Sequence, residues 1–278
     1  MKTLYKIFIA VSILTFVFCT QCSSPQNITL DILSREQDPA DSNNYIVHNK
    51  KVTLPADEVA IILCDVWNNS SDRINEMVAE MNKVVKAARD KGVFIIHAPA
   101  ECMEYYKDTP QRKLAQDAPY AEPPNEIKRR VEDPAIEPPL PGTFGHLGHR
   151  IDTKKASTKI SKPSNTWTKE NDLIEIELGD AVSDDGQEIY NLLEQRGIDN
   201  VIIMGFATDI CMVRRSYGIR QMVYNEKNII LCRDLTDISS QRTGQHSDDL
   251  QLIIEHIEKY WCPSITSESL TGKPPYKS

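Results

Sequence analysis

The chain has 278 residues, a formal net charge of −8 at pH 7 and a hydrophobic fraction of 40%. Its length suits one large α/β domain or two smaller domains, and its hydrophobic content is sufficient for a buried core. The acidic charge argues against nucleic acid as the main partner, because phosphate binding needs clustered Lys and Arg, and against binding to an anionic membrane by charge alone.

Residues 1–22 have the pattern of a targeting leader. Two lysines precede the apolar run 7–18, which is shorter than the roughly 20 residues that a transmembrane helix needs, and polar residues follow it. Cys19 and Cys22 are candidates for the lipid-modified cysteine of a bacterial lipoprotein, although neither follows a good small-residue signal; an uncleaved anchor is the alternative. We therefore expect an exported protein, periplasmic or anchored to the outer membrane, with no other membrane contact.

Seven cysteines occur, and five lie beyond the leader: Cys64, Cys102, Cys211, Cys232 and Cys262. An odd number in an exported chain leaves at least one thiol free or intermolecular. No C-x-x-C pair occurs among them, which argues against a zinc ribbon or a thioredoxin-type site.

Residues 23–56 form a tether and an extended segment ahead of the main domain, which we place at 57–278. Apolar residues alternate with polar ones over 28–32, as in a half-buried strand, and 45–47 is a second candidate strand. Asn43-Asn44 suits a turn between them. We expect a short N-terminal β ribbon packed on the main domain.

The main domain begins with a β-α-β pattern. The continuous apolar run Val59–Cys64 is typical of a strand buried on both faces. Apolar residues at helical spacing follow over 74–88, after capping residues at 69–71 and before Gly92. A second buried strand covers 93–96.

Residues 98–170 interrupt this alternation. The segment is rich in proline and charge, and it is too long for a plain connection. We expect a lid or side wall over a site, with a surface insertion as the alternative.

After the insertion the alternation resumes. The pattern predicts a strand at 173–176, a helix from Asp184 or Asp185 to Gly197, a strand at 201–204, a helix at 211–223, a strand at 228–232 and a last helix at 250–257. The predicted fold class is therefore α/β, in three layers, with a mostly parallel sheet covered on both faces.

Ligands bind beyond the carboxyl ends of the strands in such sheets. Asp65 and His97 each end a predicted strand, and the run 205–211 joins a strand to a helix that begins near Cys211. A thiol in the first turn of a helix is favoured as the reactive thiolate, and unpaired N–H groups there could stabilise an oxyanion. Asp65 would carry the proton. The alternative is that Cys211 is a buried small hydrophobe.

Two runs carry a family resemblance. Ile61-Ile62-Leu63-Cys64-Asp65-Val66-Trp67 and Gly205-Phe206-Ala207-Thr208-Asp209-Ile210-Cys211 are similar to motifs of isochorismatase-like cysteine hydrolases, which include nicotinamidases. The resemblance covers roughly 55–97 and 172–262. It implies a Rossmann-like sheet of six parallel strands, Cys211 as nucleophile and Asp65 as proton carrier. It also implies a cis bond between Phe206 and Ala207 beside Thr208, which would turn N–H groups, those of Ala207 and Cys211 among them, toward an oxyanion.

The sequence lacks the lysine of that family's Cys–Asp–Lys triad. The expected position falls near Leu178, and the nearest lysine is Lys169, about nine residues too early. Without a cation, Asp65 would raise the pKa of the thiol by like-charge repulsion. Either another cation, such as Lys169 or one from the 98–170 segment, replaces the lysine, or the site is weak or inactive.

The other candidate residues carry weaker signals. His97 has no partner histidine nearby, and a glycine-rich turn is the favoured interpretation for His146 and His149, so we expect no metal and no cofactor. His97 and Trp67 remain candidates for the pocket wall. Arg214 and Arg215 follow Cys211; one could bind a substrate carboxylate, but solvation or pairing with Asp234 or Asp237 is favoured.

The sequence thus predicts an exported hydrolase that acts on an amide or related bond of a small molecule. The alternatives are a small-molecule-binding protein on the same fold that has lost catalysis, and a redox-responsive thiol protein. The resemblance also suggests a homo-oligomer.

Overall fold

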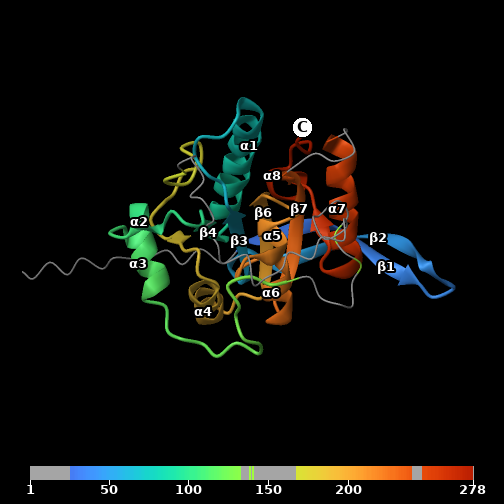
Figure 1. Cartoon of the computed structure of the whole chain (residues 1–278), viewed down its shortest axis with the longest axis horizontal. Helices are drawn as coiled ribbons and strands as arrows, with labels where there is room; N and C mark the ends of the chain where they lie inside the picture. Colours follow the sequence, from blue (N-terminus) through green and yellow to red (C-terminus); the bar gives the residue numbers. More distant parts are fainter. Residues whose placement is uncertain (1–25, 133–137, 139, 141–166, 240–245, 278) are drawn as a thin grey trace, which may run out of the picture.

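The computed structural model describes residues 26–132, 138, 140, 167–239 and 246–277 (Figure 1). The predicted leader at 1–22 and the pair His146 and His149 lie outside the described residues. No helix of the described part is both long and apolar enough to cross a membrane.

A single eight-stranded sheet forms the centre of the molecule, in the order β2-β1-β8-β7-β6-β3-β4-β5. Its strands are β1 (Asn27–Asp38), β2 (Asp41–Pro55), β3 (Val59–Cys64), β4 (Phe94–Ala98), β5 (Ala181–Val182), β6 (Asn200–Phe206), β7 (Asn228–Asp237) and β8 (Ser264–Ile265). The strands from β8 to β5 pair in parallel, whereas β1 is antiparallel to both β2 and β8. This arrangement confirms the predicted α/β class; the N-terminal ribbon joins the sheet and extends it to eight strands.

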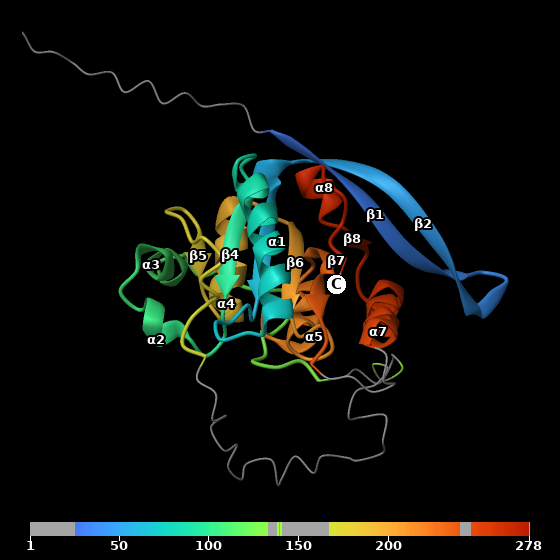
Figure 2. The ribbon, with the colours of Figure 1, turned by 90° about the horizontal axis from the view of Figure 1, so that it is seen from above.

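Helices cover both faces of the sheet (Figures 1 and 2). They are α1 (Asp72–Arg89), α2 (Met103–Tyr106), α3 (Pro110–Gln116), α4 (Gly186–Arg196), α5 (Cys211–Arg214), α6 (Ile219–Tyr224), α7 (His246–Tyr260) and α8 (Glu268–Thr271). Alternate residues of β3 point to opposite faces: Ile62 packs in the cluster with α4 to α7, and Ile61 packs in the cluster with α1 and α8. Both faces of the central strands are therefore buried, as their continuous apolar runs predicted.

Helix boundaries follow the local capping residues. The side chain of Ser71 accepts a hydrogen bond from the N–H of Ile74 at the start of α1, and Asp185 accepts from two N–H groups at the start of α4. Gly197 ends α4 in the left-handed conformation. Gly92 has a positive φ but lies three residues beyond the end of α1.

Three sequence expectations about the strands were wrong. The turn of the N-terminal hairpin lies at residues 39–40, and Asn43 and Asn44 belong to β2. Residues 173–176 are not a strand; the fifth strand is the short β5, which follows them. The hairpin is also longer than expected, and Figure 2 shows that it extends well past the body of the domain. Buried and exposed residues alternate only over 28–32 of β1. The sequence pattern therefore predicted only this part of the strand, which packs on the domain.

The predicted helix at 211–223 is broken in two. The first part, α5, ends at Arg214, and α6 begins at Ile219. Arg215 leaves the helix with extended backbone angles. Gly218 allows the close return of the chain, because a Cβ there would lie 2.6 Å from the carbonyl oxygen of Met212.

The five cysteines beyond the leader are all free thiols. Four are buried, and Cys211 is the one with intermediate exposure. The geometry therefore singles out Cys211 as the thiol that a small molecule can reach.

Candidate active site

Asp65 lies directly after β3, at the carboxyl end of the sheet. Its side chain is fully buried, and its backbone has a φ of 52°. The N–H of Asp65 donates to the carbonyl of Ala98 in β4, which fixes the residue between two neighbouring strands. The carboxylate is thus held in the protein interior, where it needs partners to stay charged.

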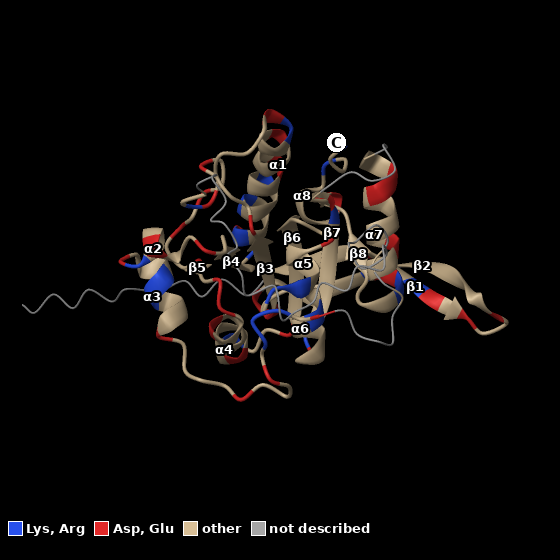
Figure 3. Ribbon diagram, in the orientation of Figure 1, with Lys and Arg blue, Asp and Glu red and all other residues tan. Residues whose placement is uncertain are grey.

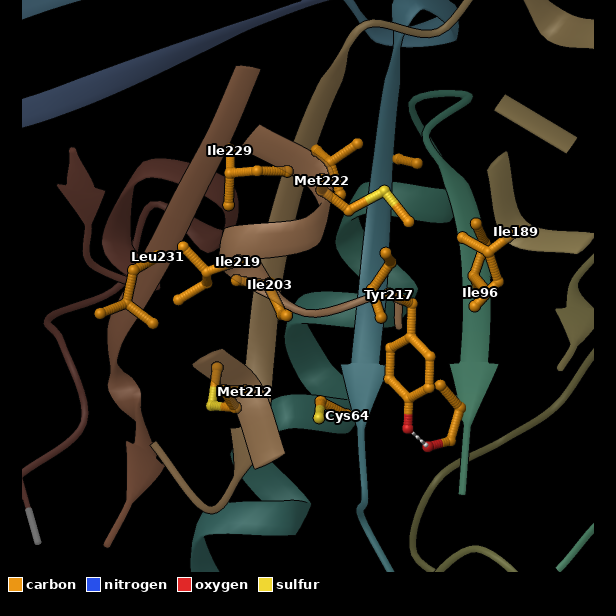
Figure 4. Packing of buried hydrophobic residues seen from close by; sticks show 14 of the residues in the cluster. Cys64, Ile96, Ile189, Ile203, Met212, Tyr217, Ile219, Met222, Ile229 and Leu231 are labelled. Atoms are coloured by element: carbon orange, nitrogen blue, oxygen red, sulfur yellow. Dashed lines mark hydrogen bonds between the residues drawn. The ribbon is translucent and has the colours of Figure 1, made fainter. Parts of the chain in front are cut away.

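Arg215 and Tyr217 supply much of this stabilisation. Arg215 donates from Nε and Nη2 to Asp65 Oδ2 at 3.0 and 2.8 Å. The Tyr217 hydroxyl lies 3.1 Å from Asp65 Oδ1, which also accepts from the N–H of Ala100. Both side chains come from the break between α5 and α6, and Figure 4 shows Tyr217 lying against β3 and β4. The break in the helix therefore brings a cation and a hydroxyl to the buried carboxylate.

Cys211 begins α5, and its thiol lies close enough to the Asp65 carboxylate for the carboxylate to raise the pKa of the thiol. The peptide bond between Phe206 and Ala207 is cis, at the position that the family resemblance implied. The backbone N–H of Ala207 lies near this thiol and lowers its pKa. No backbone carbonyl of the described residues accepts from the N–H of Ala207 or Cys211. These two groups are therefore donors available at the thiol.

Gly205 permits the close approach of β6 to β3 just before this turn. It has a φ of +127°, and a Cβ at this position would lie 2.1 Å from the carbonyl oxygen of Cys64. Any side chain would push apart the two strands that carry Asp65 and the run to Cys211.

The electrostatics keep Cys211 as a thiol rather than a thiolate. Burial and the Asp65 carboxylate raise the pKa of Cys211 to about 12, and Arg215 only partly opposes them. Burial also raises the pKa of Asp65, against the lowering effect of Arg215. The sequence expectation that a helix dipole would favour the thiolate is wrong, because α5 has only four residues.

A pocket of about 350 Å³ opens onto Cys211. Its lining residues are Glu101, Arg129, Arg130, Ile210, Cys211, Arg214 and Arg215. The volume lies within the usual range for small-molecule sites, roughly 300–1,000 Å³. The pocket is strongly basic although the whole chain carries a net charge of −8.

Thr208, Phe206 and Trp67 are not among the residues that line this pocket. Thr208 is buried and bonded through its N–H and hydroxyl to the carbonyl of Asp237 in β7. Phe206 packs against the core on the α1 side of the sheet. Trp67 stacks on Trp167 with ring centroids 4.0 Å apart. The contacts of these three residues therefore lie elsewhere, and they do not form the wall of the pocket.

His97 lies in a separate buried charge network. Its Nδ1 is 2.7 Å from Glu170 and its Nε2 is 3.2 Å from Asp180. Burial lowers the pKa of His97, but the two carboxylates outweigh it and raise the pKa to about 9. Both ring nitrogens are therefore occupied, and the structure does not bring His97 to the Cys211 pocket.

Among the sequence candidates for a replacement cation, Lys169 pairs with Asp172 and lies near the ring of Tyr105, while residues 141–166 of the 98–170 segment lie outside the described residues. Arg215 occupies the expected electrostatic position, and Asp237, one of its expected partners, pairs with Arg73 and His246 instead. No group of three or more His, Cys, Asp or Glu side chains that could hold a metal ion occurs among the described residues.

Comparisons with known proteins give matches only among solved structures. No family model matches the chain, and no curated protein matches it. A cysteine hydrolase from Pseudomonas syringae pv. phaseolicola 1448A is 13% identical, with a TM-score of 0.48 over 79% of this chain and 93% of that chain. An isochorismatase family protein from Burkholderia thailandensis is 14% identical, with a TM-score of 0.45 over 78% and 95%. N-carbamoylsarcosine amidase from Thermoplasma acidophilum is 14% identical, with a TM-score of 0.41 over 76% and 96%.

These TM-scores are all below 0.5 and leave the chemistry to be argued from the side chains at the carboxyl end of the sheet. Sequence reasoning singled out Cys211 and Asp65 but missed Arg215 and Tyr217 as partners of Asp65. The signals available were the proximity of Arg215 to Cys211 in the chain and Gly218, a helix-breaking residue three positions after Arg215.

Proposed function

We propose that this protein is a cysteine hydrolase that cleaves an amide or related acyl bond of a small molecule. The observation that carries the proposal is the position of the buried Asp65 carboxylate close enough to the Cys211 thiol to act on its pKa, with Cys211 itself lining a pocket. A nucleophile beside a general base, with N–H donors at the reacting atom, is the arrangement that acyl transfer requires.

The first half of the reaction acylates the enzyme. The sulfur of Cys211 attacks the substrate carbonyl carbon while the thiol proton moves to Asp65, so that the thiol need not ionise beforehand. The N–H groups of Ala207 and Cys211 stabilise the oxyanion. When the tetrahedral intermediate collapses, the C–N or C–O bond breaks and Asp65 returns the proton to the leaving group.

The second half releases the acid. Water attacks the thioester and gives a proton to Asp65, the C–S bond breaks, and the proton returns to the sulfur. Arg215 provides the positive charge that keeps Asp65 ionised in the interior between these transfers. Arg215 thus supplies the positive charge that the lysine of a Cys–Asp–Lys triad would supply and that this sequence lacks at the expected position.

The number of hydrogen bonds that the Asp65 carboxylate already accepts favours a second candidate function. In this candidate the protein binds a small molecule without turnover. Arg215, Tyr217 and the N–H of Ala100 all donate to this carboxylate. These donors occupy the carboxylate lone pairs that a general base needs in order to accept the thiol proton. This candidate predicts that a ligand occupies the pocket and leaves unchanged.

An activated ester, p-nitrophenyl acetate, separates the two functions. The hydrolase should release more than one equivalent of p-nitrophenol per protein and carry acetyl on Cys211, detected by peptide mass spectrometry. Cys211→Ala should abolish both signals, and Cys232→Ala, a change at a buried cysteine of β7, should retain them. Release that is unaffected by Cys211→Ala would overturn the proposal, and a single acylation without further release would favour the binding protein.

The proposal includes export, which the pattern of residues 1–22 supports. Expression of the full chain in a bacterium, followed by fractionation and intact mass measurement, tests it. A mature protein that begins near Cys19 or Cys22 in the envelope fraction is the expected result, and an uncut chain in the cytosol would contradict it.

A further inference from the structure

The pocket at Cys211 is enclosed on one side by a segment that the rest of the fold holds in place. Residues 121–131 follow α3 and pass below α4 toward α5 and α6 (Figure 1). The N–H of Ala121 donates to Asn191 of α4 at 3.0 Å. The N–H of Asn125 donates to Asn225, just after α6, at 2.9 Å.

The same segment is held more closely where it reaches the pocket. The N–H of Lys128 donates to Gln221 of α6 at 2.9 Å, and the side chain of Gln221 is itself buried. The N–H of Val131 donates to the carbonyl of Arg214, and Arg130 forms a β-bridge with Arg215. The backbone of 128–131 is therefore fixed against the helix break that supplies the partner of Asp65.

This attachment places two arginines at the pocket mouth. Arg129 and Arg130 line the pocket, are exposed to solvent, and make no ion pair with any residue that the structure describes. Figure 3 shows the basic residues gathered where the segment passes α5 and α6. Arg214 lines the same pocket, and Glu101 is the one carboxylate in the lining.

The charge of the lining selects the substrate. Arg215 is neutralised by Asp65, whereas Arg129 and Arg130 make no ion pair with a described residue, so two unpaired arginines and Glu101 border a space of about 350 Å³. Guanidinium groups match carboxylate and phosphate oxygens in geometry and charge. A neutral amide would make no ion pair with these two guanidinium groups, whereas an anionic group would.

We infer that the substrate is an acyl compound that carries a second, anionic group, a carboxylate or a phosphate, which Arg129 and Arg130 bind while its carbonyl lies over Cys211. This inference rests on the proposed function, because it assigns the substrate class of the same site. The pocket volume limits the substrate to a small molecule, in which the anionic group lies only a few bonds from the scissile carbonyl.

A matched pair of esters tests the inference. Mono-p-nitrophenyl succinate carries a carboxylate on its acyl group, and p-nitrophenyl acetate does not. After each rate is divided by that of a free thiol, the protein should acylate Cys211 at least about tenfold faster with the succinate ester, because a hydrogen bond to a charged group contributes about 1.5–3 kcal/mol. The preference should decrease as salt is added.

Substitutions at the arginines test which residues cause the preference for the succinate ester. In the double variant Arg129→Ala, Arg130→Ala the normalised preference for the succinate ester over the acetate ester should disappear. Lys128→Ala is the matched control, because Lys128 is on the same segment but lines a neighbouring pocket, and it should keep the preference. Competition by succinate would identify a carboxylate site and competition by inorganic phosphate a phosphate site; both results support the inference.

The two proposals fail in different ways. Equal normalised rates for both esters, with acylation still dependent on Cys211, would overturn the anionic substrate and leave the hydrolase intact. A preference that survives in the double variant would also overturn the role of the two arginines. If neither ester acylates Cys211, the proposed function itself is wrong.

Discussion

Arg215 donates two hydrogen bonds to a single carboxylate oxygen of Asp65, although the two residues are 150 positions apart in the chain. The contact exists because the helix that begins at Cys211 ends after four residues and its next residue turns back toward β3. Nucleophile, base and cation therefore come from two short segments, and the cation lies four residues after the nucleophile.

Removing the cation should disable the site. Arg215→Ala leaves a buried carboxylate without its charged partner, so the free energy of unfolding should fall by about 3 kcal/mol and acylation by p-nitrophenyl acetate by about 10²-fold or more. Arg215→Lys should recover part of both, because it keeps the charge but loses one of the two donors. Urea unfolding and ester kinetics measure the effects.

Lys169→Ala is the informative control for this prediction. Lys169 pairs with Asp172 and is the lysine nearest to the position expected from the sequence. Its loss should leave acylation unchanged. If Lys169→Ala disables the site and Arg215→Ala does not, the assignment of the cation is wrong.

Asp65→Asn should change thiol reactivity and turnover in opposite directions. The carboxylate raises the pKa of Cys211, so its removal lowers that pKa and speeds alkylation by iodoacetamide at neutral pH, about tenfold for each unit of pKa. Release of p-nitrophenol beyond the first equivalent should nevertheless stop, because no group remains to transfer the proton.

Peptide mass spectrometry after alkylation measures the first effect, and the four buried cysteines serve as internal controls. They should stay unlabelled in the folded protein before and after the substitution. Slower alkylation of Cys211 in Asp65→Asn would show that the carboxylate activates the resting thiol, contrary to the geometry.

The network around His97 should make stability depend on pH. The pKa of His97 is raised to about 9 in the folded protein, above its ordinary value of 6.5. A raised pKa stabilises the fold fully below about pH 6.5, and this contribution is lost as the pH rises through about 9. The loss should amount to about 3 kcal/mol, since one pKa unit corresponds to about 1.36 kcal/mol.

Denaturant unfolding across this pH range checks the prediction. His97→Gln should have a lower free energy of unfolding than the parent at low pH. It should also lack most of the fall in that free energy as the pH rises. His48→Gln is the control, because His48 is exposed on β2 and should leave the curve unchanged. An unfolding free energy that is the same for the parent and His97→Gln at every pH would refute the role of the network.

Gly205 and Gly92 form a matched pair for testing the approach of β6 to β3. Both have positive φ, +127° and +101°, so alanine strains the backbone at either position by about 1–3 kcal/mol. At Gly92 the added Cβ meets nothing within 4 Å, whereas at Gly205 it would collide with the carbonyl of Cys64. Gly205→Ala should therefore be much the more destabilising substitution, or should fail to fold. Equal unfolding free energies for the two variants would contradict the close approach.

The sequence alone determined the parallel sheet and the positions of Asp65 and Cys211 at its carboxyl end. Continuous apolar runs mark buried strands, and capping residues such as Ser71 and Asp185 mark helix starts, because these signals depend on neighbours in the chain. The run from Gly205 to Cys211 also indicated the cis bond through its family resemblance.

Only the tertiary structure decided which groups meet Asp65 and what surrounds Cys211. Helical periodicity continues through Arg215 in the sequence, whereas the folded chain breaks there and places a cation and the Tyr217 hydroxyl on Asp65, about 150 residues earlier. The same holds for His97, whose carboxylate partners lie more than 70 residues away. Local patterns cannot report such contacts, since their energy comes from burial and charge pairing that exist only after the sheet has assembled.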